Sequence, residues 1–451
     1  MNDSESRQQR INSLRTRFSE LYEAAPMTVL RAPARINVLG EHVDYVSYLP
    51  TASLVFGSGE HEMLMAFRVS DDERVRGASL NSEFAPFAFT LNDAPEPDAD
   101  WNEWLYDRPV PAPHWGNYVK GAVFFARHLY GRRASRGFDF VVDSTIPPKG
   151  GASSSSALTV LAGAAIRMAG EIEFEPHQLA RESARAEWYV GTRGGAMDHT
   201  AICLSARHHA VYLSYREDTA ELVPLPGDDF RWMTFFSHEA DKGREMMLEY
   251  NERAAVARLL IPSFTGQLSA ADDLQAVIEN LPVSVALDDI ERTNPQVFSA
   301  CAAAFPALVQ ERRTRPLKLR DRAQHHLGEM RRVEAAARLL RQASDRDSPE
   351  VMRELGRLLN ESHASLRDLY EVSTPQVNHL IEIITADPEV YGARLMGGGF
   401  GGNVLALTTA TNVQALVSRV QRDFYSPQQR DARREGAVMI STPGDGLSAV
   451  Q

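Results

Sequence analysis

Residues 147–160, PPKGGASSSSALTV, place two prolines, two glycines and four serines directly before an apolar run. Because the first turn of a helix has unpaired backbone N–H groups and a positive dipole end, this stretch suits a bound anion such as phosphate. An ordinary loop with a helix-capping serine fits the same residues equally well. Glycine-bearing stretches at 31–45 and 392–404 could let the backbone approach a ligand, although each alone is also typical of a tight turn. The rest of the chain must therefore decide between the two interpretations.

The common nucleotide-binding motifs are absent from the sequence. The dipeptide Gly-Lys does not occur, which excludes a Walker A loop, and neither His-Arg-Asp nor Asp-Phe-Gly of protein kinases is present. Residues 397–402, GGGFGG, match the dinucleotide fingerprint formally, but the following NVLALTT has a strand pattern where that fingerprint needs a helix. The isolated pairs His208–His209 and His325–His326 are interpreted as surface or strand histidines rather than metal ligands.

The composition is typical of a globular protein with more than one core. A chain of 451 residues suits two or three domains, and its 43% hydrophobic content is ordinary for this class. The net charge of −12 argues against a general nucleic-acid-binding surface but allows a local anion site. Two cysteines, Cys203 and Cys301, exclude a disulfide framework. The polar start and the lack of a long apolar run lead us to expect a cytoplasmic protein without a membrane span.

The spacing of apolar residues predicts the elements that must position these stretches. Strands are expected over 28–40, before the two prolines, over 208–236, and on both sides of the glycines in 392–409. Residues 92–116 are rich in proline and aspartate and predict a loop or an ordered excursion. Helices are expected over the apolar run after the serines and over 117–131, 176–191, 317–344, 349–370 and 1–25, where Ile11, Leu14, Phe18 and Leu21 have helical spacing. A domain boundary is placed near 220–230.

Several stretches together resemble the galactokinases within the GHMP kinase superfamily. RAPARINVLGEHVDY resembles their sugar-binding signature, PPKGGASSSSAL their phosphate-binding loop, and GARLMGGGFGGNVLAL their third, glycine-rich motif. WGNYVKG, GAMDHT, YNER and NESHASLRDLYEVSTPQVNHL are also galactokinase-like, and the similarity runs from about 28 to 410 in family order. The resemblance implies an α+β, two-lobed fold, with a ribosomal-protein-S5-like lobe over 26–225, a ferredoxin-like lobe over 226–445 and an active site in the cleft.

The resemblance also answers the question that the serine run raises. It implies that ATP phosphates bind a loop whose N–H groups and helix dipole offset their charge, without a P-loop lysine. This loop comprises Lys149, Gly150, Gly151, Ala152, Ser153, Ser154 and Ser155, with Lys149 standing where the family usually has glycine. Ser155 and Glu187 match the Mg²⁺ ligands, a hydroxyl and a carboxylate that suit a hard cation. Trp115 and Tyr118 are candidate adenine contacts, although both also suit the core of a helix.

Two further groups of residues correspond to catalysis and sugar binding. Asp198 matches the carboxylate that takes or orients the proton of the attacking hydroxyl, and Arg35 matches the arginine beside it. The residues matched to the sugar are Glu41, His42, Asp44 and Tyr250. After Asp44 the chain reads YVSYLP, where galactose-specific members usually read YNDGFVLP, so the substrate-pocket wall departs from the family.

The resemblance thus implies a sugar kinase that uses ATP and Mg²⁺ to phosphorylate the anomeric C1 hydroxyl, with galactose as the first expected substrate. N-acetylgalactosamine or another galactose-like sugar is an alternative acceptor. A sugar sensor without catalysis is the alternative from a different functional class. The joint presence of Arg35, Asp198, Ser155 and Glu187 favours the enzyme, because a sensor would be free to lose them.

Overall fold

The computed structural model describes residues 3–96, 99–106, 108–147, 151–191, 194–225, 229–239, 244–343, 348–431 and 436–450. Of the predicted phosphate loop, Lys149 and Gly150 lie outside these ranges. None of the helices in the described ranges is long and apolar enough to cross a lipid bilayer.

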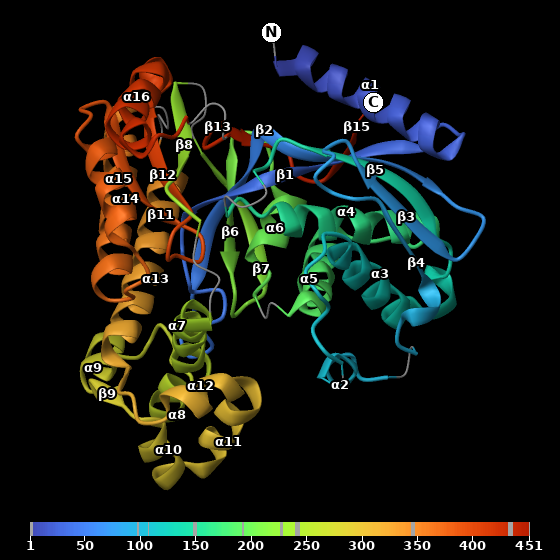
Figure 1. The fold of residues 1–451 in the computed structure, drawn as a ribbon. Helices are drawn as coiled ribbons and strands as arrows, with labels where there is room; N and C mark the ends of the chain where they lie inside the picture. The colour runs from blue at the N-terminus through green and yellow to red at the C-terminus, as the bar shows by residue number, and fades with distance from the viewer. Residues whose placement is uncertain are drawn as a thin grey trace.

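A nine-stranded sheet forms the core of the first lobe of the described chain (Figure 1). The antiparallel pair of β1 and the 18-residue β2 lies at its centre. The strands follow one another across the sheet in the order β15-β1-β2-β5-β3-β4, and β6, β7 and β14 pair beside this series. Its strands are β1 (Thr28–Leu39), β2 (Ala52–Val69), β3 (Arg74–Ser79), β4 (Phe87–Thr90), β5 (Phe138–Ser144), β6 (His209–Ser214), β7 (Thr219–Pro224), β14 (Pro443–Gly444) and β15 (Ser448–Val450). The C-terminal end of the chain thus returns to the first lobe, whereas the boundary between 225 and 226 stays a prediction.

Helices cover both faces of this sheet. One face is covered by α3 (Gly116–Tyr130), α4 (Ser154–Ala169), α5 (Pro176–Glu187) and α6 (Met197–Leu204) (Figure 1). On the other face lies α1 (Asp3–Tyr22), whose Ile11, Leu14 and Phe18 are buried as their spacing predicts. Leu21 remains exposed, so it does not belong to the apolar face that we expected.

The excursion before α3 is ordered in the part that the structure describes. It contains η1 (Leu91–Asp93) and α2 (Trp101–Tyr106), which agrees with the ordered excursion of the two predicted alternatives. Trp101 is buried, with its ring 4.9 Å from that of Phe125, and its indole N–H donates to the carbonyl of Arg185 on α5. These contacts attach the excursion to the helical layer.

In the described part of the second lobe, four antiparallel strands form a sheet in the order β11-β12-β8-β13. With the helices between them, β8 (Phe230–Phe236), β11 (Val390–Met396), β12 (Asn403–Thr409) and β13 (Val438–Ser441) form the β-α-β-β-α-β arrangement of a ferredoxin-like fold. The helices that pack beside it are α13 (Arg320–Gln342), α14 (Pro349–Asp368), α15 (Pro375–Thr385) and α16 (Val413–Val420) (Figure 1). The predicted strand–glycine turn–strand unit over 392–409 is therefore β11 and β12.

A group of shorter helices is inserted between β8 and α13. It contains α7 (Arg244–Ala255), η4 (Val256–Leu260), α8 (Ile261–Thr265), α9 (Leu274–Glu279), α10 (Leu287–Thr293), α11 (Pro295–Ala304) and α12 (Pro306–Arg312), together with β9 (Ser284–Val285) and β10 (Leu317–Lys318). Their apolar faces form a core that also contains Val46, Tyr48 and Leu49. The segment that departs from the galactokinase pattern is therefore packed into this insertion.

One expectation about histidines is wrong. His325 and His326 lie on α13 and are fully buried, neither at the surface nor in a strand. Burial of polar rings requires hydrogen bonds. Here Ser365 bonds His325, and the hydroxyls of Tyr48 and Tyr370 bond His326.

Candidate active site

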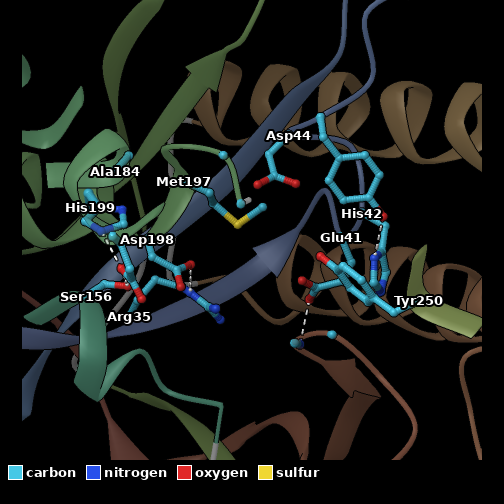
Figure 2. A pocket seen from close by; sticks show the side chains of 16 residues that line it. Arg35, Glu41, His42, Asp44, Ser156, Ala184, Met197, Asp198, His199 and Tyr250 are labelled. Carbon is cyan, nitrogen blue, oxygen red and sulfur yellow. Dashed lines mark hydrogen bonds and ion pairs between the residues drawn. The ribbon is translucent and has the colours of Figure 1, made fainter. Parts of the chain in front are cut away.

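A cavity of about 190 Å³ lies where β1, α4, α6, α7 and the glycine turn after β11 meet. The candidate residues in its lining are Arg35, Glu41, His42, Asp44, Glu187, Asp198 and Tyr250, which the sequence predicts, and Tyr45, Ser156, Met197 and His199, which it does not. Figure 2 shows two groups of side chains, with Met197 between them. We call Arg35, Ser156, Glu187, Asp198 and His199 the Asp198 side, and Glu41, His42, Asp44, Tyr45 and Tyr250 the His42 side.

Asp198 is the most strongly connected carboxylate of the Asp198 side. It lies in the first turn of α6, where it accepts a hydrogen bond from Arg35 Nε at 2.7 Å and one from Ser153 Oγ at 2.5 Å. Burial acts to raise the pKa of Asp198, but the charge and hydrogen bond of Arg35 and the Ser153 hydroxyl outweigh it and lower the pKa overall. Asp198 is thus an ionised acceptor at neutral pH.

Arg35 joins the first strand to the loop after β5. Its backbone N–H donates to the carbonyl of Ala152, and its side chain is 7% exposed. Its Nη1 atom is buried and has no hydrogen-bond partner among the described residues. A buried cationic donor without a partner beside Asp198 suits an anionic group such as a transferring phosphoryl.

The loop before α4 has the backbone of an anion site. Gly151 has a φ of +68° and Ser153 a φ of +62°, so the chain turns through the left-handed region just before the helix starts at Ser154. Ser153 occupies the N-cap position, but its hydroxyl donates to Asp198 rather than to the helix, which corrects the capping interpretation. Among the described residues, the Ser153 hydroxyl therefore does not occupy the first N–H groups of α4, which suit an anionic ligand.

Glu187 and its neighbours form a second polar cluster. Glu187 Oε2 accepts a hydrogen bond from Ser156 Oγ at 2.9 Å and lies 2.7 Å from His199 Nε2. Tyr118 lies close to this cluster, since the Ser155 hydroxyl and the Glu187 charge both act on its pKa, which burial raises. Ser156 is the last serine of the run and His199 follows Asp198, so proximity in sequence was the only signal for either.

A carboxylate with adjacent hydroxyls is a suitable donor set for a hard divalent cation. No group of three or more His, Cys, Asp and Glu side chains in the described ranges is arranged to hold a metal ion. Glu187, with Ser155 or Ser156, would therefore supply part of a coordination sphere whose other ligands come from phosphate and water. The residues present fit a cation that arrives with a nucleotide.

Trp115 packs within an aromatic cluster. Its indole N–H donates to the carbonyl of Ala85 at 2.8 Å, and its ring centroid is 4.7 Å from that of Phe87. Neither Trp115 nor Tyr118 lines the cavity. Their assignment to adenine stays a prediction.

Glu41 connects the two lobes on the His42 side. Its Oε2 atom accepts hydrogen bonds from Arg394 Nη2 at 2.8 Å and from the backbone N–H of Gly397 at 2.9 Å, and Figure 2 marks a contact from this carboxylate. Buried Glu329 of α13 accepts the N–H of Gly40, which fixes the turn before Glu41. The carboxylate of Glu41 is thus held by the glycine-rich motif of the second lobe.

Asp44 and the aromatic residues complete the His42 side. Burial, together with the negative charges of Asp198 and Glu41, raises the pKa of Asp44 to about 6. Tyr250 of α7 lies over His42, with ring centroids 6.1 Å apart (Figure 2). His42 is buried, and its Nδ1 atom lies 2.8 Å from the hydroxyl of Tyr45. Aromatic faces and hydrogen-bonding groups in one cavity suit a small polyol.

Comparison with known proteins agrees with this geometry. The chain matches the family models "GHMP kinases N terminal domain" over 117–206, "GHMP kinases C terminal" over 336–426 and "Galactokinase galactose-binding signature" over 16–52. It is 28% identical over 448 residues to a galactokinase of Chloroflexus aurantiacus, covering 98% of both chains. It is 29% identical to a galactokinase of Bos taurus, covering 91% of both.

Solved structures show the same fold. The Lactococcus lactis galactokinase complexed with galactose matches with a TM-score of 0.72 and 23% identity, covering 98% of this chain and all of that one. The mevalonate kinase of Methanococcus jannaschii matches with a TM-score of 0.54 and 14% identity, covering 92% and 97%. The chain thus carries the two GHMP kinase domain models and the galactokinase galactose-binding signature in the order that the sequence motifs predict, and the curated relatives that it matches along almost its whole length are galactokinases.

Proposed function

We propose that the protein transfers the γ-phosphoryl group of ATP to the C1 hydroxyl of galactose, with Mg²⁺ as the metal. The observation that carries this proposal is one cavity in which an ionised Asp198, paired with Arg35, shares the lining with Glu41, His42 and Asp44. These three residues lie within the segment that matches the galactose-binding signature.

The residues of the Asp198 side supply what phosphoryl transfer needs from a protein. Asp198 is placed to accept the hydrogen of the attacking sugar hydroxyl and so to orient its oxygen. Arg35 keeps that carboxylate ionised, and its unpartnered Nη1–H is a donor for charge on the phosphoryl oxygens. When bound, the divalent cation neutralises phosphate charge, and Glu187 with Ser155 would help to hold it.

The His42 side supplies sugar orientation. Carboxylates at Glu41 and Asp44 accept hydrogen bonds from ring hydroxyls, and Tyr250 covers His42 at the side of the cavity. This arrangement supports a reducing hexose placed with one hydroxyl towards Asp198. The cytoplasmic location expected from the sequence remains a prediction.

The test is an ADP-release assay with the full-length protein, ATP and Mg²⁺ over galactose, N-acetylgalactosamine, glucose and arabinose. We expect ADP release only when sugar and Mg²⁺ are both present, with galactose the best substrate. Preference for another sugar would overturn the substrate but keep the reaction. A protein that binds sugar and ATP yet releases no ADP above background would instead be a sensor.

A further inference from the structure

A line of ring side chains, all buried except half-buried Tyr45, leads from the cavity into the second lobe. His42 Nδ1 lies 2.8 Å from the Tyr45 hydroxyl, which lies 3.0 Å from the hydroxyl of Tyr370. The Tyr370 hydroxyl is 3.4 Å from His326 Nε2, and His326 Nδ1 is 2.9 Å from the Tyr48 hydroxyl. Four hydrogen bonds thus connect five residues from three distant parts of the sequence.

The histidine and tyrosine side chains of this hydrogen-bond series are neutral at physiological pH. Burial lowers the pKa of His42 to about 4, and it lowers the pKa of His326 well below its ordinary value. Burial also raises the pKa of Tyr45 and Tyr48 far above the usual range. Each imidazole therefore has one N–H donor and one acceptor nitrogen, and each hydroxyl has one hydrogen to donate.

Tyr48, at the end of this hydrogen-bond series far from the cavity, determines which atom donates in the bonds that follow. Tyr48 is fully buried, and within the described residues its hydroxyl has His326 Nδ1 as its hydrogen-bond partner. If His326 Nδ1 donated, the Tyr48 O–H would be buried without an acceptor, which is costly. Tyr48 must therefore donate, and His326 then carries its hydrogen on Nε2.

The same direction continues to the cavity. With its hydrogen on Nε2, His326 donates to Tyr370, whose buried hydroxyl then has Tyr45 as its acceptor among the described residues. We infer that Tyr45 in turn donates to His42 Nδ1. His42 is left with its hydrogen on Nε2. That nitrogen is buried, belongs to a residue that lines the cavity, and has no hydrogen-bond partner among the described residues.

We propose that Tyr48, acting through His326, Tyr370 and Tyr45, fixes His42 as the Nε2–H tautomer, so that the protein presents an N–H donor to one sugar oxygen. This inference rests on the proposed function, because it takes the ligand of His42 to be a sugar. Tyr45, Tyr48 and Tyr370 are positioning residues. Tyr48 lies in YVSYLP, the segment that departs from the galactokinase pattern. The residue that orients the hydrogen bonds towards His42 is therefore part of that departure.

The tautomer can be measured in the free, full-length protein by ¹⁵N NMR of labelled imidazoles, with His42→Gln identifying the His42 signals. We expect neutral His42 with hydrogen on Nε2 in the wild type and a mixture of tautomers in Tyr48→Phe. Tyr425→Phe is the matched control, because Tyr425 is equally buried and donates to the carbonyl of Phe236 in another core. An Nδ1–H tautomer in the wild type, or an unchanged distribution in Tyr48→Phe, would overturn the proposal.

The sugar readout compares deoxygalactoses with deoxyfluorogalactoses modified at C2, C3, C4 or C6. Fluorine keeps a weak hydrogen-bond acceptor but cannot donate. The position at which His42→Gln no longer changes kcat/KM identifies the hydroxyl that His42 contacts. There, the wild type should use the fluoro sugar roughly two- to tenfold better than the deoxy sugar. Tyr48→Phe should lose this difference while the KM for ATP stays unchanged.

Failure of the tautomer inference can be told apart from failure of the proposed function. If the protein phosphorylates no sugar, the proposed function fails, whereas the NMR measurement still decides the tautomer. If galactose is phosphorylated but the fluoro sugar is no better than the deoxy sugar at the identified position, His42 does not donate and the inference is wrong. The inference is also wrong if His42→Gln affects all the sugars equally.

Discussion

The two sides of the cavity are built in different ways. Residues of the Asp198 side come from β1, α4, α5 and α6 of the first lobe, and they meet through direct charged hydrogen bonds. Residues of the His42 side are held from the second lobe, Glu41 by Arg394 and Gly397, and His42 through Tyr45 by Tyr370. One side is assembled within a lobe and the other between lobes.

We infer that the Asp198 side serves phosphoryl transfer and that the His42 side serves recognition of the sugar. Because phosphoryl transfer depends on a fixed pairing of charges, a site within one rigid lobe serves it well. On the His42 side, the predicted sugar contacts are a neutral imidazole and carboxylates, and the lobe interface holds one of these carboxylates, Glu41. Substitutions on the Asp198 side should therefore act on kcat, and those on the His42 side on sugar KM and on the packing of the lobes.

Among the substitutions considered, Asp198→Asn should reduce the catalytic rate most. The change is nearly isosteric, but it removes the ionised acceptor that Arg35 and Ser153 maintain. We expect kcat to fall by roughly 10²- to 10⁴-fold, with galactose and ATP binding close to normal. Steady-state kinetics and calorimetric binding would measure this. The control is Asp139→Asn, which weakens an ion pair with Arg76 on the first-lobe sheet. Near wild-type turnover in Asp198→Asn would refute the role assigned to Asp198.

Arg394→Met tests whether the His42 side depends on the lobe interface. It leaves Glu41 and Glu329 buried without their common cation, and removal of one partner of a buried ion pair costs about 3–5 kcal/mol. Thermal and denaturant unfolding should show this loss, and the remaining folded enzyme should have a raised KM for galactose. Arg292→Met breaks an exposed pair with Asp289 and should cost about 0–1 kcal/mol. Equal losses in the two variants would contradict the comparison.

Local sequence predicted the elements around the cavity better than the contacts that join the two lobes. The serine run, the turn before α4 and the strand that carries Arg35 follow from composition and periodicity, which report short-range structure. The contacts Glu41–Arg394 and Tyr45–Tyr370 span more than 300 residues, so no local pattern contains them. Buried His325 and His326 were misjudged for the same reason, because their partners Ser365, Tyr48 and Tyr370 come from other elements.

Asp44→Ala probes the His42 side without disturbing the lobe contacts. A hydrogen bond from a sugar hydroxyl to a carboxylate contributes about 1.5–3 kcal/mol, so kcat/KM for galactose should fall roughly tenfold to a hundredfold. The KM for ATP should barely change, because the predicted phosphate loop contacts the Asp198 side through Ser153. An unchanged sugar KM and turnover would show that the binding signature was assigned to the wrong residues.

The smallest expected effect is a pH dependence of galactose affinity, which should arise from the His42 side alone. Burial and the charges of Asp198 and Glu41 raise the pKa of Asp44 to about 6, against a weaker opposing effect of Arg258. If the ionised carboxylate accepts hydrogen bonds from the sugar as proposed, affinity for galactose without nucleotide should weaken as the pH falls through 6, by at most about tenfold per pH unit.

The stability of the free protein should change in the opposite direction. Asp44 binds its proton more tightly in the folded state than in the unfolded chain, so its contribution to stability is lost as the pH rises from about 4 through 6. Asp44→Asn should remove both dependences, leaving a flatter galactose affinity and a smaller stability difference between pH 5 and pH 7.5. Calorimetric titration and thermal unfolding of the two proteins across this range measure both effects. If Asp44→Asn keeps the wild-type pH profile of galactose binding, the titrating group is another residue and Asp44 does not act as the charged acceptor.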